Sequence, residues 1–457
     1  MHQHRFIRFI IKADHLRAKY IKHRNMLIFL SFTVGMLSAL AAVLLKISVQ
    51  FVEHRVIKLN DMMNSNWLSA TFPLIGTGIS FFIIYKIWQG RLNRGVGFIV
   101  QSIFTQKSKI PKRHVFGQLI TSAITVAFGG SVGLEAPIVA TGAAIGSNAG
   151  TDLRLSYRDT TLLLACGAAS GIAAVFNCPI AGIIFSLEVL MIDFKIPSMI
   201  PLLISTATAT VLSQILYPDK FIFLAINGWD IKALPFYIAL GIFCGFTSVY
   251  TTYVINAVED FFYKRKQNWL VWLMAGVPLC LIIFFLPNLY GEGYTLIAHL
   301  LKGNYEVITR HTFLHIPGNK PFVIILICLL MIGFKALTAS LTMAAGGNGG
   351  TFAPSLIIGG LVGFVFAYFI NETGYYKLNT ANYIIVAMAG VLAGVMHAPL
   401  TGIFLLAEIT GGYTLFVPLM IVTALSYFIT RKYVRHSMYH KILVQKEIIK
   451  TEEETYL

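Results

Sequence analysis

Apolar runs close to the length of a membrane span recur along the whole chain. A membrane-spanning helix needs about 20 predominantly apolar residues. Examples of such runs are residues 26–52, 70–88, 236–255, 269–286 and 322–341. Only 12% of the 457 residues are charged, whereas soluble domains carry about 25%. The sequence therefore predicts an all-α integral membrane protein, and it excludes a large soluble helical protein.

The net charge of +16 would suggest a nucleic-acid partner in a soluble protein. Here the basic residues gather at both ends and in one loop, which the positive-inside rule explains without nucleic acid. We expect a multi-pass protein of the cell (inner) membrane, embedded in the lipid bilayer with both termini cytoplasmic. Residues 1–25 read as a basic amphipathic helix on the cytoplasmic membrane surface, or alternatively as a disordered basic tail. Residues 444–457 read as a short cytoplasmic tail.

A single carboxylate, Glu135, stands inside an apolar region in the glycine-rich stretch 129–137. A charge at membrane depth is costly and marks a functional site by default. Glycines allow the backbone to turn sharply there, and Pro137 suits the first turn of a helix. We therefore expect a glycine loop that delivers Glu135 to a helix N-terminus. Helix N-termini attract anions, so the site would bind an anion, and the Glu135 carboxylate could itself occupy it.

The same pattern occurs twice. Residues 133–137 and 176–188 form the first copy, and residues 350–354 and 396–408 form the second. The two prolines of a copy are 42 residues apart in the first and 45 in the second, and each copy ends in a glutamate nine residues after its second proline. Paired, broken helices are typical of transporter folds whose binding site lies at the repeat interface. The residues alone leave open whether the repeats are inverted or parallel.

The cysteines and histidines give little support for a metal site or a cofactor site. The five cysteines lie in apolar stretches and read as small buried residues. The segment 286–321 reads as an extramembrane loop, and its histidines, His299, His311 and His315, match no metal-ligand spacing. We expect no metal and no cofactor.

An intramembrane enzyme would need a second catalytic group at the depth of Glu135. Asp152 and Asp159 fall in a polar loop, and the second repeat has Phe352 opposite Glu135. We therefore do not expect an enzyme. A membrane scaffold without transport activity would leave the paired glycine motifs unexplained.

At these motifs the chain resembles the CLC family of chloride channels and chloride/proton exchangers. The matching stretches are 130–137, 171–179, 350–354 and 398–402, and the resemblance runs from about residue 26 to 443. It implies a CLC-type inverted-repeat bundle of tilted and broken helices, with a first membrane repeat at 26–217 and a second at 218–443. It also implies a homodimer with one anion pathway per subunit.

The resemblance implies roles for individual residues. Glu135 corresponds to the external gate, whose carboxylate competes with chloride and leaves when protonated. Phe352 corresponds to the ion-facing phenylalanine. Tyr439 corresponds to the pore tyrosine, although an interfacial belt tyrosine is the alternative. The anion-binding residues implied are Val96, Gly97, Phe98, Gly133, Leu134, Gly350, Thr351, Phe352, Ala353 and Tyr439.

Two positions depart from the family pattern. Val96 stands where the family has a pore serine, so one hydroxyl ligand is missing, and fluoride-handling members also have an apolar residue there. Val189 stands where well-coupled exchangers have a proton-transfer glutamate, and valine cannot relay a proton. The neighbouring Glu188 could substitute, but as the counterpart of Glu408 in the repeat we expect it to be structural.

We therefore expect transmembrane chloride transport gated by protonation of Glu135, with chloride as the transported ion and protons as a second candidate. The alternatives are a coupled chloride/proton antiporter and a fluoride-selective member of the same family. The sequence leaves open the choice between channel and exchanger, the preferred anion, the voltage dependence and the physiological role.

Overall fold

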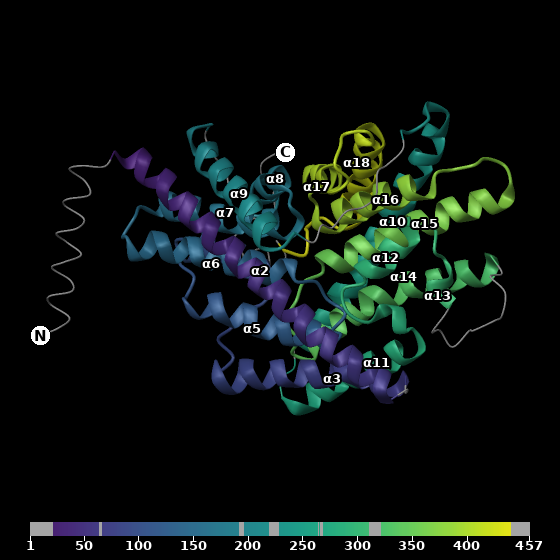
Figure 1. The fold of residues 1–457 in the computed structure, drawn as a ribbon, viewed down its shortest axis with the longest axis horizontal. Helices are drawn as coiled ribbons and strands as arrows, with labels where there is room; N and C mark the ends of the chain where they lie inside the picture. The colour runs from purple at the N-terminus through teal and green to yellow at the C-terminus, as the bar shows by residue number, and fades with distance from the viewer. Residues whose placement is uncertain are drawn as a thin grey trace, which may run out of the picture.

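The computed structural model describes residues 22–63, 66–191, 196–218, 228–263, 265, 268–309 and 321–439. Most of the predicted basic segment 1–25 and all of the predicted tail 444–457 lie outside these residues. Helices inclined at many different angles make up the described part (Figure 1). Their bounds are α2 (His23–Met63), α3 (Asn66–Phe82), η1 (Ile83–Ile87), α4 (Gly97–Thr105), α5 (Arg113–Ala127), α6 (Glu135–Asp152), α7 (Tyr157–Phe176), α8 (Pro179–Glu188), α9 (Ile196–Leu216), η2 (Ile231–Ala233), α10 (Leu234–Tyr263), α11 (Trp269–Phe285), η3 (Pro287–Leu289), α12 (Tyr294–Leu301), α13 (Glu306–Thr309), α14 (Pro321–Ala344), α15 (Phe352–Thr373), α16 (Thr380–Met396), α17 (Pro399–Ile409) and α18 (Phe416–Tyr433).

The apolar runs form long helices, as predicted. Within the described ranges, seven helices are long and apolar enough to cross a membrane. The longest, α2, crosses the face of the molecule diagonally in Figure 1. Between residues 113 and 216 the chain instead breaks into α5 to α9, and α8 has only 10 residues. The prediction of an all-α membrane protein with broken helices is confirmed.

Two glycines of α6 let its backbone touch the backbone of α7. A Cβ atom on Gly142 would lie 2.1 Å from the Gly167 carbonyl oxygen, and one on Gly146 would lie 1.9 Å from the Leu163 carbonyl oxygen. The second repeat uses the same device, because a Cβ on Gly363 of α15 would lie 2.1 Å from a carbonyl oxygen of α16. Small residues at such crossings allow close van der Waals packing of membrane helices.

The two motif copies contact one another at their first glycines. Gly133 and Gly350 form an isolated antiparallel bridge, in which the N–H of each donates to the carbonyl of the other at 2.9 and 3.0 Å. Residues in corresponding positions of the two copies therefore pair with opposite chain directions. The two copies are therefore related by a local two-fold rotation.

The two repeat glutamates show the same two-fold relation. Glu188, at the end of α8, accepts hydrogen bonds from the N–H groups of Leu400 and Thr401 at the start of α17, at 2.9 and 2.7 Å. Glu408, near the end of α17, accepts hydrogen bonds from the first turn of α8 at 2.8 and 3.1 Å. Each carboxylate thus caps the N-terminus of the other helix. Because both Glu188 oxygens are used in this way, the geometry supports a structural role for this residue.

The segment 286–321, which the sequence analysis expected to be an extramembrane loop, contains a packed helix in its described part. Residues 294–301 form α12, whose Leu296, Ile297 and Leu300 are buried, and α12 packs against α15 and α16. A helix of 8 residues is too short to show a clear apolar period, so its burial depends on contacts that the sequence does not reveal. Residues 310–320, with two of the three histidines, lie outside the described residues.

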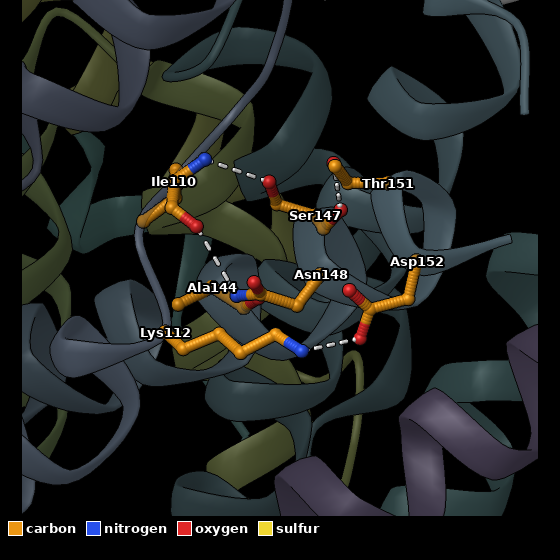
Figure 2. Close-up of polar contacts among 7 residues, drawn as sticks. All are labelled: Ile110, Lys112, Ala144, Ser147, Asn148, Thr151 and Asp152. Carbon is orange, nitrogen blue, oxygen red and sulfur yellow. Dashed lines mark hydrogen bonds and ion pairs between the residues drawn. The ribbon is translucent and has the colours of Figure 1, made fainter. Parts of the chain in front are cut away.

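The segment that joins α4 to α5 is tied to the far end of α6 (Figure 2). Ser147 Oγ accepts a hydrogen bond from the Ile110 N–H at 2.8 Å and donates to the Ser108 carbonyl at 2.6 Å. Asn148 donates to the Ile110 carbonyl at 3.1 Å. These contacts fix α4 relative to α6, and both helices begin at motifs that the sequence analysis assigned to the anion site.

Replacing Ser147 by Ala should destabilise the protein by about 1–3 kcal/mol, because it leaves a buried N–H and a buried carbonyl without partners. The measurement is the temperature at which the detergent-solubilised protein loses its monodisperse chromatographic peak. The matched control is Lys112→Ala. This substitution removes the ion pair between Lys112 and Asp152, whose nitrogen and oxygen atoms are 2.7 Å apart. The two side chains are 69% and 56% exposed, so losing the pair should lower the free energy of unfolding by less than about 1 kcal/mol. Equal losses in the two variants would contradict the prediction.

Candidate functional site

Glu135 is the first residue of α6 and its side chain is only 2% exposed. Its Oε1 accepts a hydrogen bond from the Tyr294 hydroxyl at 2.6 Å. Its Oε2 makes no hydrogen bond of normal geometry to a described residue, although the backbone N–H groups of Glu135 and Ala353 lie close to the carboxylate. That oxygen folds back over Gly133, where an added Cβ would lie 2.0 Å from it. The added atom would also lie 2.7 Å from the Ala353 Cβ atom, which cannot rotate away, so position 133 requires glycine in this conformation.

A second helix N-terminus lies against the same carboxylate. The Gly133–Gly350 bridge places the start of α15, Phe352, next to the start of α6. A Cβ atom added to Gly133 would lie close both to Glu135 Oε2, at 2.0 Å, and to the backbone nitrogen of Ala353, at 3.1 Å. Free N–H groups and the helix dipole make such a place favourable for negative charge. The Glu135 carboxylate thus occupies a position suited to an anion.

A cavity of about 450 Å³ opens beside these N-termini. It collects residues from three distant segments: Val96 and Gly97, then Gly350 and Thr351, and finally Tyr439. The hydroxyls of Thr351 and Tyr439 are buried without a hydrogen bond of normal geometry to any described residue, although they lie close to one another. Two buried hydroxyl donors in a cavity at helix N-termini form a suitable lining for an anion.

Val96 precedes the first turn of α4 and is 1% exposed. Its side chain has no hydroxyl that could donate a hydrogen bond to an anion, as the sequence indicated. The backbone N–H groups in the first turn of α4 are therefore the hydrogen-bond donors that this segment offers. Phe98 is buried against the ring of His114, with the ring centroids 5.1 Å apart. Phe352 packs between Phe176 and Phe185, at centroid distances of 5.8 and 6.4 Å.

Three of the expected backbone donors are engaged within the protein. The N–H groups of Gly133 and Gly350 are used in their mutual bridge. The N–H of Leu134 donates to Glu292 Oε1 at 3.1 Å. In this structure these three N–H groups have long-range partners within the protein, and the prediction that their residues bind an anion stays a prediction.

The sequence analysis missed three charged or polar residues around Glu135. Glu292 and Tyr294 come from the segment that it assigned to a loop. Lys335 of α14 is fully buried and donates to Ser131 Oγ and to the Gly291 carbonyl, both at 2.9 Å. The signal available for Glu292 was its isolation between two glycines, and for Lys335 it was a charge inside an apolar run.

The two aspartates considered for an enzyme lie elsewhere. Asp152 is at the opposite end of α6 from Glu135 and pairs with Lys112, whereas Asp159 contacts His23 at 3.4 Å. In the parts of the chain that the structure describes, no group of three or more His, Cys, Asp or Glu side chains is arranged to hold a metal ion.

Comparisons with known proteins agree with this geometry. A family model described as voltage gated chloride channel matches residues 76–431. The chain is 28% identical over 419 residues to the H(+)/Cl(-) exchange transporter ClcA of Vibrio cholerae, which covers 86% of this chain and 84% of that protein. It is 26% identical over 369 residues to a putative chloride channel protein, ClcB-like, of Ralstonia nicotianae, which covers 77% of this chain and 80% of that one.

Two solved structures share the fold. A slow cyanobacterial Cl-/H+ antiporter matches with a TM-score of 0.78 and 21% identity, covering 94% of this chain and 100% of its own. A CLC-type fluoride/proton antiporter matches with a TM-score of 0.75 and 23% identity, covering 91% and 97%. The inverted-repeat fold predicted from the sequence is confirmed.

Proposed function

The chain belongs to the voltage-gated chloride channel family, the CLC family, and from this premise we propose that it exchanges chloride for protons across the membrane. The sequence analysis put a proton-gated chloride pathway first and coupled exchange second. The similarity to the ClcA exchange transporter over most of both chains favours the second. We also propose that it acts as a homodimer in the cell membrane with both termini cytoplasmic.

The observation that carries the proposal is the position of the Glu135 carboxylate. It is buried at the N-terminus of α6, beside the N-terminus of α15 and next to the cavity that Thr351 and Tyr439 line. A carboxylate and a chloride ion compete for such a place, because both are anions. Protonation removes the charge of Glu135 and allows chloride to take the position.

Exchange requires that chloride and the proton cross the membrane in opposite directions. The proton bound by Glu135 must therefore be released on the side from which chloride entered. Val189 is 1% exposed and offers no group that could carry a proton. The proton must therefore pass through the cavity, where the hydroxyls of Thr351 and Tyr439 are available to hydrogen-bond water. The carboxylates of Glu259 and Asp260 also line this cavity, so a proton can pass there by way of hydroxyls, water and carboxylates although residue 189 offers none.

Fluoride is the second candidate ion. Val96 presents no hydroxyl to the cavity, and the structure of a fluoride/proton antiporter has the same fold. Chloride is preferred here because the relatives similar over most of the sequence are named for chloride.

The test is the reversal potential of the purified protein in lipid bilayers. With equal chloride on both sides and a pH gradient, exchange predicts a reversal potential that departs from zero. A potential that stays at zero contradicts exchange and indicates a channel. Repeating the measurement with fluoride and with nitrate separates the chloride and fluoride proposals.

A further inference from the structure

A second carboxylate, Glu292, contacts the turn that carries Glu135. Its Oε1 accepts a hydrogen bond from the N–H of Leu134, the residue directly before Glu135, at 3.1 Å. Two residues further on, the Tyr294 hydroxyl donates to Glu135 Oε1 at 2.6 Å. One short segment therefore contacts both the backbone and the side chain of this turn. The remaining oxygen, Glu135 Oε2, is buried and makes no hydrogen bond of normal geometry to a described residue.

The segment around Glu292 is held in place from both sides. Gly291 and Gly293 adopt positive φ angles of 63° and 99°, which turn the chain sharply around Glu292. The Gly291 N–H donates to the Gly129 carbonyl at 3.0 Å, and the buried Lys335 ammonium donates to the Gly291 carbonyl at 2.9 Å. Glu292 is thus fixed relative to the start of α6 and does not sit on a freely moving loop tip.

Several charged groups face Glu292. Glu135 of α6 and Glu53 of α2 are like charges, whereas Lys46 of α2 and Lys335 of α14 are opposite charges. Glu292 lies outside the seven candidate spans. Burial and the charge of Glu135 raise the pKa of Glu292 to about 8, although the Leu134 N–H and Lys46 oppose the rise. Glu292 therefore holds a proton in neutral solution and gives it up in mildly alkaline solution.

We propose that Glu292 and Glu135 form a proton-sharing carboxylate pair, in which Glu292 supplies the proton that neutralises Glu135. Two carboxylates in one partly buried site do not both ionise at low cost, and such a pair titrates as a unit. Glu292 loses a proton as Glu135 gains one, so the total charge of the pair is unchanged by the transfer. Glu292 acts through Glu135, so this inference rests on the proposed function.

The test is the pH dependence of chloride flux in reconstituted vesicles for four proteins: the wild type, Glu292→Gln, Glu135→Gln and the double variant. Glutamine keeps the oxygen that accepts from Leu134, so the turn is retained. Without Glu292 no shared proton remains beside Glu135, which must then be protonated directly from solution, and we expect the midpoint of the flux profile to move about one pH unit lower. In the Glu135→Gln background, adding Glu292→Gln should leave the pH dependence of the flux unchanged, because the carboxylate that Glu292 would act on is gone.

The control is Glu306→Gln, which removes an exposed carboxylate from the neighbouring α13 and should leave the profile unchanged. If Glu292→Gln does not fold, Glu292→Asp replaces it. Its shorter side chain moves the proton-donating carboxyl group away from Glu135, so the midpoint should move in the same direction by less. A Glu292 variant with the wild-type profile overturns the carboxylate pair. A wild type with no chloride flux, or with flux independent of pH, overturns the proposed function itself.

Discussion

Replacing Glu135 by Gln is expected to abolish proton transport while chloride still passes. Glutamine has nearly the same shape as glutamate and still offers an oxygen to the Tyr294 hydroxyl, which donates to Glu135 at 2.6 Å in the wild type. It carries no charge, however, so it neither competes with chloride at the N-terminus of α6 nor binds a proton. Each unit of pH changes the ratio of protonated to ionised carboxyl about tenfold, and the variant should lose this dependence.

The measurement is chloride efflux from vesicles across a series of pH values, with proton movement followed in parallel. The wild type should transport faster as pH falls, and Glu135→Gln should give one rate at all pH values and no proton movement. Glu306→Gln, which removes an exposed carboxylate, is the control and should behave as the wild type. Chloride flux in Glu135→Gln with an unchanged pH dependence would contradict the role of Glu135.

Replacing Gly146 by Ala is expected to lower the free energy of unfolding by about 3 kcal/mol or more, which is enough to prevent folded protein from accumulating. The added methyl group would lie 1.9 Å from the Leu163 carbonyl oxygen and 2.5 Å from its carbonyl carbon. These are backbone atoms of α7, so no side chain can rotate to make room. The two helices must separate, and α6 carries Glu135 at its first residue.

The matched control is Gly333→Ala in α14, where the nearest atom to the added methyl, the Tyr250 hydroxyl oxygen, would lie 3.8 Å away. Alanine favours helix over glycine by about 1 kcal/mol, so this variant should be as stable as the wild type or more so. Yield and thermal stability of the purified proteins in detergent provide the comparison. Normal yield and stability of Gly146→Ala would show that the α6–α7 contact is not as close as described.

Local sequence predicts the helix starts well. The motif copies placed helix N-termini near Glu135 and Phe352, and α6 and α15 begin at these residues. Pro179 and Pro399 begin α8 and α17. Proline fixes φ at a value suited to a helix start and lacks the N–H that would need a partner there. Such effects act within a few residues, so they can be read from the sequence.

The surroundings of Glu135 could not be read in the same way. Nothing in the sequence around Leu134 indicates that its N–H donates to Glu292, which is 158 positions further along the chain. The pairing of Gly133 with Gly350 likewise depends on how the two repeats dock. Long-range contacts of this kind decide which donors remain available to an anion, and in this structure they give the N–H groups of Gly133, Leu134 and Gly350 partners within the protein.

Proton movement driven by a chloride gradient tests the account most directly. Vesicles loaded with high chloride are diluted into low-chloride medium, with a potassium ionophore to balance charge, and the external pH is recorded. Exchange predicts that chloride leaving the vesicles draws protons inward, so the external medium becomes alkaline, and that a protonophore collapses the change. Chloride efflux at the normal rate with no change in external pH would contradict the account.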